Sequence, residues 1–298
     1  MEQITVRVPA STSNLGPGFD CLGVALRIYN TITLARSASR RHFPPRIVSE
    51  AADRFFKQAR RRAFSFSCSV MEQIPRSRGL GSSATIRLGI LLALNRLNGN
   101  PLDRLELFQL CAELEGHPDN AAPATFGGFT VVGSARCADS RKRSGQRRVR
   151  AIHRSAVSPR LCFVLLVPDL EIQTSRARNV LPSKISHAKA VENCANACAL
   201  TAAFVSQDYE KLRGVFADHL HQPFRTKLVP FLPGVVAAAE KAGALGAFLS
   251  GSGSTICALK LGSAKEVGQA VLRATGAIPA RIIITHADNH GAKVLTSN

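Results

Sequence analysis

The sequence contains no tryptophan and only two tyrosines in 298 residues. No apolar stretch approaches the ~18 residues that a membrane-spanning helix needs, so we expect no membrane association. The first residues, MEQITVRVPAST, lack the basic and apolar regions of a secretory signal. Hydrophobic residues (45%) and charged residues (20%) occur in ordinary globular proportions, which excludes disordered and fibrous classes. At ~100–200 residues per domain, the length predicts two domains.

Closely spaced cysteines are also missing, because the eight cysteines are scattered without a CxxC pair. Most lie in apolar runs, such as Cys162 in LCFVLLV and Cys257 in TICAL. We interpret Cys194 and Cys198, four residues apart in a predicted helix, as core residues too. In a chain without an export signal, such cysteines are typical of reduced thiols and indicate a cytoplasmic location.

Acidic residues are scarce, since 39 Lys and Arg stand against 20 Asp and Glu for a net charge of +19. Residues 36–62 hold nine basic and two acidic residues, and residues 136–154 hold eight and one. Neither segment contains Trp or Tyr, so both are poor material for stacking nucleic-acid bases. We interpret them as solvated, Arg-rich loops and expect no nucleic-acid partner, although a positive field also attracts an anionic substrate.

Hydrophobic periodicity predicts an α+β protein in two halves, 1–155 and 156–298, that meet near the end of the second basic segment. We expect one helix to start with Ser82 as its N-cap and to stop at Gly99, and another over 102–115. The first strand is expected over 4–8 and ends at Pro9. Further strands are expected over 128–133, 161–167, 246–249, 255–260 and 281–285. Further helices are expected over 186–205, 209–219, 234–242 and 264–275.

The clearest chemical signal is the glycine-rich turn Gly79–Ser83, which opens the predicted helix. Glycines allow close backbone approach, and a helix N-terminus offers free N–H groups and a positive dipole end to an anion. The Ser82 and Ser83 hydroxyls suit a phosphate oxygen or Mg²⁺. Neither GxxxxGK[ST] nor a GxGxxG after a strand occurs, so a nucleotide site here belongs to another family.

Three further polar segments accompany this turn: residues 13–20, 115–120 and 249–255. Each alone is compatible with ordinary turn chemistry, but their combination in one chain favours a ligand site. His219 and His221, and His286 and His290, have ligand-like spacings, but we expect no carboxylate or cysteine to join either pair. We interpret these four histidines as surface residues and not as a zinc site.

The sequences of these segments, and their order in the chain, resemble those of the GHMP kinase superfamily and, within it, of the homoserine kinases. The superfamily motifs are PASTSNLGPGFDCLGVAL, IPRSRGLGSSAT and LSGSGSTICAL, and the narrower signatures are EGHPDN, TSRARNVLP and HLHQPFR. The resemblance runs from Ile4 to about Leu261, with Thr85 and SGSGST departing slightly from the usual pattern. It implies the two-domain GHMP kinase fold, with an N-terminal domain like ribosomal protein S5 domain 2 and a ferredoxin-like C-terminal domain.

The resemblance implies ATP and Mg²⁺ as ligands of the glycine-rich turn. Ser83 and a helix carboxylate would hold the metal; we favour Glu115, although spacing alone leaves Glu113 open. The implied nucleotide-binding residues are Pro75, Arg76, Ser77, Arg78, Gly79, Leu80, Gly81, Ser82, Ser83, Ala84, Gly251 and Gly253.

The resemblance also implies L-homoserine as the phosphoryl acceptor, in a step toward threonine. Arg178 and Arg225 would hold its carboxylate, because a guanidinium binds a carboxylate through two hydrogen bonds. The remaining implied substrate residues are Asn14, Asp20, His117 and Asp119, and the implied catalytic residues are Asp119, Asn120 and Thr174. Asn120 stands near where other members of the superfamily place an Asp, so we name no general base and expect Asp119 to orient the hydroxyl.

Two other functions stay open at this point. One is a related GHMP kinase that acts on mevalonate, shikimate or a sugar, and the other is a non-catalytic, basic RNA-binding protein of the same fold. A homodimer also stays open.

Overall fold

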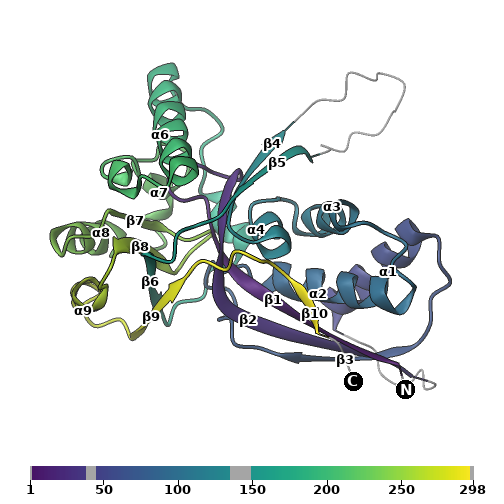
Figure 1. Ribbon diagram of the computed structural model, residues 1–298. Coiled ribbons are helices and arrows are strands. Elements are labelled where there is room, and N and C mark those ends of the chain that lie inside the picture. The colour runs from purple at the N-terminus through teal and green to yellow at the C-terminus, as the bar shows by residue number, and fades with distance from the viewer. Residues whose placement is uncertain (1, 38–44, 135–148, 296–298) are drawn as a thin grey trace.

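The computed structural model describes residues 2–37, 45–134 and 149–295. Most of the second basic segment, including Cys137, therefore lies outside the described residues. Two antiparallel sheets organise the described chain, with helices packed against both (Figure 1).

The first sheet has the order β10-β1-β2-β4-β5, with β3 also paired to β2. Because β2 is 15 residues long, its start pairs with β4 and its end with β3. Its strands are β1 (Gln3–Ser13), β2 (Leu22–Arg36), β3 (Phe66–Met71), β4 (Phe129–Ser134), β5 (Val149–Ser155) and β10 (Lys293–Leu295).

Among the described residues, four helices pack with this sheet: α1 (Arg46–Ala59), α2 (Ser82–Leu97), α3 (Arg104–Glu115) and α4 (Ala121–Phe126). Side chains of β1 and β2 at alternate positions, such as Val6, Val8, Ile32 and Leu34, share one buried core with α1, α2 and α3. Alternation along a strand sends these side chains to a single face, which explains why the helices gather there (Figure 1).

Three local predictions in this half are wrong. Strand β1 continues through Pro9, because a register shift between Pro9 and Ala10 accommodates the missing N–H. Ser82 is the first residue of α2, and Gly81 is its N-cap. The first basic segment is not simply a loop, since α1 occupies residues 46–59 and buries Val48 and Phe55 among other apolar residues.

The second sheet has the order β7-β8-β6-β9, built from β6 (Leu161–Pro168), β7 (Gly246–Leu249), β8 (Ile256–Leu261) and β9 (Ala280–His286). Every residue of β6 is buried, because both faces of the strand are covered. Val164 and Leu166 pack toward α8 (Leu232–Lys241) and α9 (Lys265–Ala274). Phe163 and Leu165 pack into a second cluster with α6 (His187–Ser206) and with β2 and β4 of the first sheet.

The predicted helix over 209–219 is wrong, because the structure has only a 3₁₀ turn at Tyr209–Leu212. Gly214 then adopts a φ of 81°. The buried Asp218 carboxylate accepts the backbone N–H groups of Leu220, His221 and Gln222. These bonds build a turn where a helix would have used carbonyl acceptors, and α7 (Gln222–Arg225) follows it.

The division at residues 155/156 stays a prediction, and one strand departs from it. β10 pairs with β1 through Thr5–Leu295 to Arg7–Lys293, so the end of the chain returns to the first sheet. Among the described residues, no helix has both the length and the apolar character to span a bilayer.

Candidate active site

A cavity of about 640 Å³ lies where the glycine-rich turn, α3, α5 (Thr174–Asn179) and the turn after β7 meet. All of the predicted site residues line it except Ala84 and Gly253. Further lining residues that the sequence did not single out include Phe19, Ser252 and the apolar residues Pro45, Ile47, Val48, Val70 and Ile86. The structure therefore brings nearly all of the predicted site into one space.

Glycine is required in the turn before α2. Gly79 and Gly81 have φ values of 75° and 70°, in the left-handed region that favours glycine. A Cβ at Gly79 would lie 2.1 Å from the Ser250 carbonyl oxygen, and one at Gly81 would lie 2.3 Å from Ser11 Oγ. The turn is thus pressed between the first and third motifs, which fixes its backbone against the cavity.

The start of α2 offers unpaired donors to this cavity. The helix's first bond runs from Thr85 N–H to Gly81 O, so the N–H groups of Ser82, Ser83 and Ala84 have no intrahelical acceptor. The Ala84 side chain is fully buried in the core. Its predicted role is therefore confined to its N–H. Gly253 packs directly against Gly79, since a Cβ added to Gly79 would lie 2.9 Å from Gly253 N.

Asn30 holds both ends of this turn, and sequence reasoning missed it. Its fully buried amide oxygen accepts from Gln73 N and Ile74 N, which precede the turn. Its amide nitrogen donates to Thr85 Oγ1 at 2.9 Å, and that hydroxyl donates to Ser82 O at 2.7 Å. The unusual Thr85 thus takes part in a buried network that positions the turn. No sequence signal marked Asn30, because it lies in the middle of a strand.

A carboxylate faces the Ser83 hydroxyl, as the metal prediction requires. Ser83 Oγ donates to Glu115 Oε2 at 2.7 Å, and Arg87 contacts the other carboxylate oxygen. Glu113 instead pairs with Arg54 and does not line the cavity. Hydroxyl and carboxylate oxygens are the ligands that Mg²⁺ prefers. Ser83 and Glu115 therefore fit a magnesium ion at the start of α2.

The opposite end of the cavity is crowded with charge. Arg178 forms a fork with Asp20, at 2.6 Å from Nη2 to Oδ1 and 3.1 Å from Nη1 to Oδ2. The guanidinium carbons of Arg178 and Arg225 each lie 5.4 Å from the centre of the Phe19 ring. Two cations over one ring form a favourable place for an anion.

Arg225 is 2% exposed although it is charged. Its Nε donates to Ala177 O at 3.1 Å, and its Nη1 donates to Gly251 O at 2.8 Å. Burial, reinforced by the positive charge of Arg178, lowers the pKa of Arg225 to about 10. A bound carboxylate would offset both effects, because it would give each guanidinium a counter-charge.

His221 is fully buried, so its interpretation as a surface residue was wrong. Its Nε2 lies 2.9 Å from Gly16 O, so Nε2 carries the proton and Nδ1 is left to accept from Arg225 Nη1 at 3.3 Å. Burial is the main cause that lowers the pKa of His221 to about 4. A neutral imidazole therefore stacks against Phe19, at 5.2 Å between ring centroids, and buttresses Arg225.

His117 and Asp119 form a close pair at 2.6 Å from Nδ1 to Oδ1. Burial opposes charge on both groups, but their mutual attraction outweighs it. The pKa of His117 is consequently raised and the pKa of Asp119 is lowered, with the charge of Arg178 lowering it further. Asp20, His117 and Asp119 lie close enough together to form one polar cluster.

The side chains of Asn14 and Asn120 are hydrogen-bonded to other groups of the protein. Asn14 donates to Gly251 O at 2.9 Å and accepts from Asp20 N at 3.0 Å, which ties the first motif to the third. Asn120 Oδ1 accepts from Ser11 Oγ at 2.8 Å, beside the Gly81 turn. Both residues still line the cavity, as does Thr174 at the first position of α5.

Comparison with known proteins agrees with this geometry. The model for the N-terminal domain of GHMP kinases matches residues 46–128, and the model for their C-terminal domain matches residues 200–278. The chain is 36% identical to a homoserine kinase of Carboxydothermus hydrogenoformans over 97% of this chain and 96% of that one. This chain belongs to the homoserine kinase family of GHMP kinases.

Other relatives extend the comparison. A homoserine kinase of Moorella thermoacetica is also 36% identical, over 97% of this chain and 99% of its own. The crystal structure of a homoserine kinase from Cytophaga hutchinsonii superposes with a TM-score of 0.85 at 28% identity, and the match covers 99% of this chain and 98% of that one. The predicted α+β GHMP kinase fold is therefore confirmed.

Proposed function

We propose that this kinase transfers the γ-phosphoryl group of ATP to the side-chain hydroxyl of L-homoserine, forming O-phospho-L-homoserine and ADP. The reaction is a step toward threonine. The observation that carries the proposal is one cavity with an anion-binding helix start at one end and two arginines at the other. Such a cavity suits a polyphosphate and an amino-acid carboxylate at the same time.

ATP would place its phosphates on the turn Gly79–Ser83, where the N–H groups at the start of α2 would donate hydrogen bonds to the phosphate oxygens. Its base would lie toward the apolar side of the cavity, formed by Ile47, Val48, Val70 and Ile86. Ser83 and Glu115 would hold Mg²⁺, which when bound neutralises charge on the phosphates. Arg78 also lines the cavity, and it donates to Pro168 O and to Asp169, which ties the turn to the end of β6.

Homoserine would direct its carboxylate to Arg225, whose Nε and Nη1 are already fixed by backbone carbonyls. That fixed orientation leaves the guanidinium rigid and ready for an anion, so little side-chain entropy is lost on binding. Asp20 and Asp119 supply negative charge for the ammonium group, and Arg178 balances Asp20 in the absence of substrate.

Catalysis would rest on positioning and charge neutralisation, since phosphoryl transfer passes through a loose transition state. Asp119 stays ionised because His117 lowers its pKa, and an acid with a low pKa is a weak base. Its role would be to accept a hydrogen bond from the homoserine hydroxyl and aim the oxygen at the γ-phosphorus. Asn120 and Thr174 would line the path of the transferred group.

The decisive experiment is a coupled ADP-release assay with purified protein, Mg²⁺, ATP and a panel of alcohols. Homoserine should give the highest kcat/KM, ahead of mevalonate, shikimate and sugars. Activity on one of those alcohols alone would replace the proposed acceptor. Salt-sensitive RNA binding that is indifferent to Ser83→Ala would support the binding-protein alternative.

Asp119→Asn tests the orienting role. It keeps the shape of the side chain but removes its charge, and kcat should fall by ~100-fold with little change in the KM for ATP. Full kcat in this variant would remove Asp119 from the mechanism. The cytoplasmic location stays a prediction.

A further inference from the structure

The carboxylate of Glu115 lies where a negative charge is unfavourable. Glu115 is the last residue of α3, and the carbonyl groups at the C-terminus of a helix carry partial negative charge. The last turn of α3 holds no basic residue that would offset this charge. The Glu115 side chain is only 6% exposed, so water and salt screen it little. A counter-charge must therefore come from outside the helix.

Arg87 supplies that counter-charge from α2. It lies one turn after Ser83, so both side chains project from the same side of the helix. Arg87 Nη1 pairs with Glu115 Oε1, while Ser83 Oγ donates to Glu115 Oε2 at 2.7 Å. Arg87 does not itself line the cavity. Its contact with the proposed magnesium site is therefore made through Glu115.

The guanidinium of Arg87 is not anchored as a purely structural arginine is. Arg104, at the start of α3, donates to the backbone carbonyls of Thr125 and Ala292. Among the described residues, the ion pairs of Arg87 are with carboxylates, and its buried Nε has no hydrogen-bond partner. Because one donor is unsatisfied in this arrangement, Arg87 loses few hydrogen bonds if it changes its partner.

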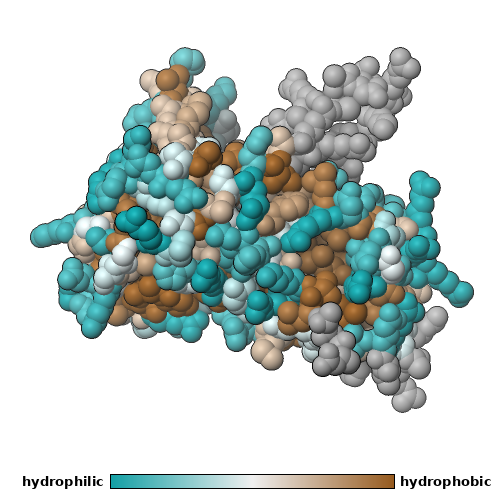
Figure 2. Space-filling model, viewed as in Figure 1, coloured by the Kyte–Doolittle hydropathy of each residue, from teal (hydrophilic) through white to brown (hydrophobic). Residues whose placement is uncertain are grey.

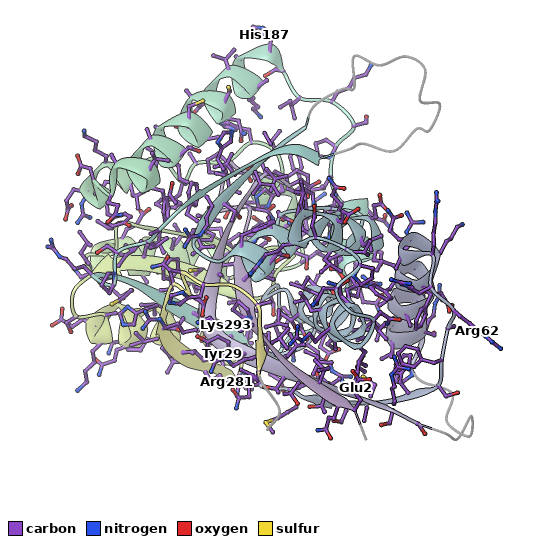
Figure 3. All side chains as sticks on the ribbon, turned by 45° about the vertical axis from the view of Figure 1, so that its right-hand side comes forward. Glu2, Tyr29, Arg62, His187, Arg281 and Lys293 are labelled. Carbon is purple, nitrogen blue, oxygen red and sulfur yellow. The ribbon has the colours of Figure 1, made fainter. Side chains whose placement is uncertain are left out.

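A second carboxylate is already within reach of Arg87. Its Nη2 lies 3.5 Å from Oε2 of Glu50, on α1, and Arg46 holds the other oxygen of Glu50 at 2.6 Å. Figures 1 and 3 show α1 at the outer edge of this half of the molecule, with Arg62 just beyond its end. Figure 2 shows a hydrophilic surface along that edge. The Glu50 carboxylate is thus an exposed alternative to the buried Glu115.

We propose that Arg87 is the exchangeable counter-charge of Glu115. Arg87 neutralises Glu115 when no metal ion is bound, and it turns to Glu50 when Ser83 and Glu115 hold one. The inference rests on the magnesium site of the proposed function and adds a positioning residue to it. Because Ile47 and Val48 of α1 line the cavity, the exchange would also strengthen the contact between α2 and the helix that forms this wall.

The exchange predicts opposite effects for the two partners of Arg87. Arg87 and a divalent cation compete for one carboxylate, because both are positive. An uncharged residue at position 87 removes the competitor, so the metal should bind more tightly. An uncharged residue at position 50 removes the alternative partner, so Arg87 stays on Glu115 and the metal should bind more weakly. An arginine that only held Glu115 in place for the metal would give weaker binding in the first variant.

Mn²⁺ is a suitable probe, because it prefers the same oxygen ligands as Mg²⁺ and free Mn²⁺ is measured directly by electron paramagnetic resonance. Mn²⁺ is titrated into the full chain with saturating ADP, and the same titration into ADP alone is the blank. The Kd for Mn²⁺ should fall ~10-fold in Arg87→Met and rise ~5-fold in Glu50→Gln. Arg87→Lys, which keeps the charge, should stay within ~3-fold of the wild type.

Arg54→Met and Glu113→Gln are the matched controls, because they break the neighbouring ion pair between α1 and α3, outside the cavity. Both should leave the Kd for Mn²⁺ unchanged. Weaker or unchanged binding in Arg87→Met, or an equal shift in Arg54→Met, would overturn the proposal. If Arg87→Met does not fold, Glu50→Gln decides, since tighter or unchanged binding there contradicts the exchange.

Glu115→Gln separates this inference from the proposed magnesium site. The site itself fails if Glu115→Gln binds Mn²⁺ as tightly as the wild type. Only the exchange fails if Glu115→Gln weakens binding but Arg87→Met does not tighten it.

Thermal unfolding gives a second readout that does not depend on activity. Without metal, Arg87→Met should unfold at a lower temperature than the wild type, because Glu115 is left buried and unpaired. Mg²⁺ with ADP should then raise the unfolding temperature more in Arg87→Met than in the wild type, since the metal binds the variant more tightly. An equal or smaller rise in Arg87→Met would contradict the exchange.

Discussion

The two ends of the cavity offer different chemical groups to a ligand. The phosphate end uses backbone N–H groups, glycines and small hydroxyls around Gly79–Ser83. The proposed acceptor end uses ionised side chains: Arg225 is buried, and the partly exposed Arg178 and Asp20 form an ion pair. A phosphate chain can be held by fixed dipoles, whereas a zwitterion needs a counter-charge for each of its ends. Substitutions at the two ends should therefore fail in different ways.

The largest expected effect is at the acceptor end. Arg225→Ala should lower kcat/KM for homoserine by ~100-fold or more, because one partner of a buried charge pair is lost. The KM for ATP should change little, as measured by initial rates with each substrate varied. Equal increases in the KM values for homoserine and ATP would show that Arg225 acts only through folding. The variant would then also unfold at a lower temperature.

Glu115→Gln should lower kcat/KM by roughly 100-fold and raise the Mg²⁺ concentration needed for half-maximal rate, because an oxygen ligand loses its charge. Glu113→Gln is the matched control on the same helix. Since Glu113 pairs with Arg54 outside the cavity, its substitution should leave the Mg²⁺ dependence unchanged. If the two variants behaved in reverse, the metal carboxylate would be Glu113.

At the phosphate end, Gly79→Ala should raise the KM for ATP by ~10-fold and leave the KM for homoserine nearly unchanged. Its Cβ would meet Ser250 O at 2.1 Å and push the turn out of place. Gly99→Ala is the matched control, because Gly99 also has a positive φ, 78°, but nothing lies within 4 Å of the added Cβ. An equal rise in KM for both variants would mean that backbone strain alone is responsible.

The smallest effect concerns pH. The unfolded chain binds a proton at His221 below pH ~6.5, while burial lowers the pKa of the folded residue to about 4. The unfolded state therefore holds more protons between these values, and the free energy of unfolding should fall as pH drops from ~6.5 to ~4.

His221→Gln should flatten this part of the stability curve, as urea unfolding at several pH values would show. His290→Gln, at an exposed position, should leave it unchanged. His117 acts in a different window, because its raised pKa makes its contribution present below pH ~6.5 and lost as pH rises through the folded pKa. An unchanged acid limb in His221→Gln would show that the buried imidazole does not govern acid stability.

Sequence patterns predicted several of the regular elements but not α1, although one face of that helix is apolar. The helix that begins after the glycine turn and the buried strand β6 both appear close to the predicted bounds. One error came from a local side chain: the carboxylate of Asp218, at the end of the predicted helix 209–219, accepts the N–H groups that follow it and builds a turn. Cys194 and Cys198 look like core residues by composition, but no described element covers their side of α6.

By itself, the sequence determined the phosphate end of the site. Glycine at 79 and 81 and the hydroxyls beside them are local requirements of a tight turn before a helix, so they are visible in one short segment. Only the tertiary structure decided the acceptor end. Arg225, Asp20 and His117 come from segments far apart in the chain, and only folding brings them to one cavity, where water is partly excluded and Coulomb interactions are stronger.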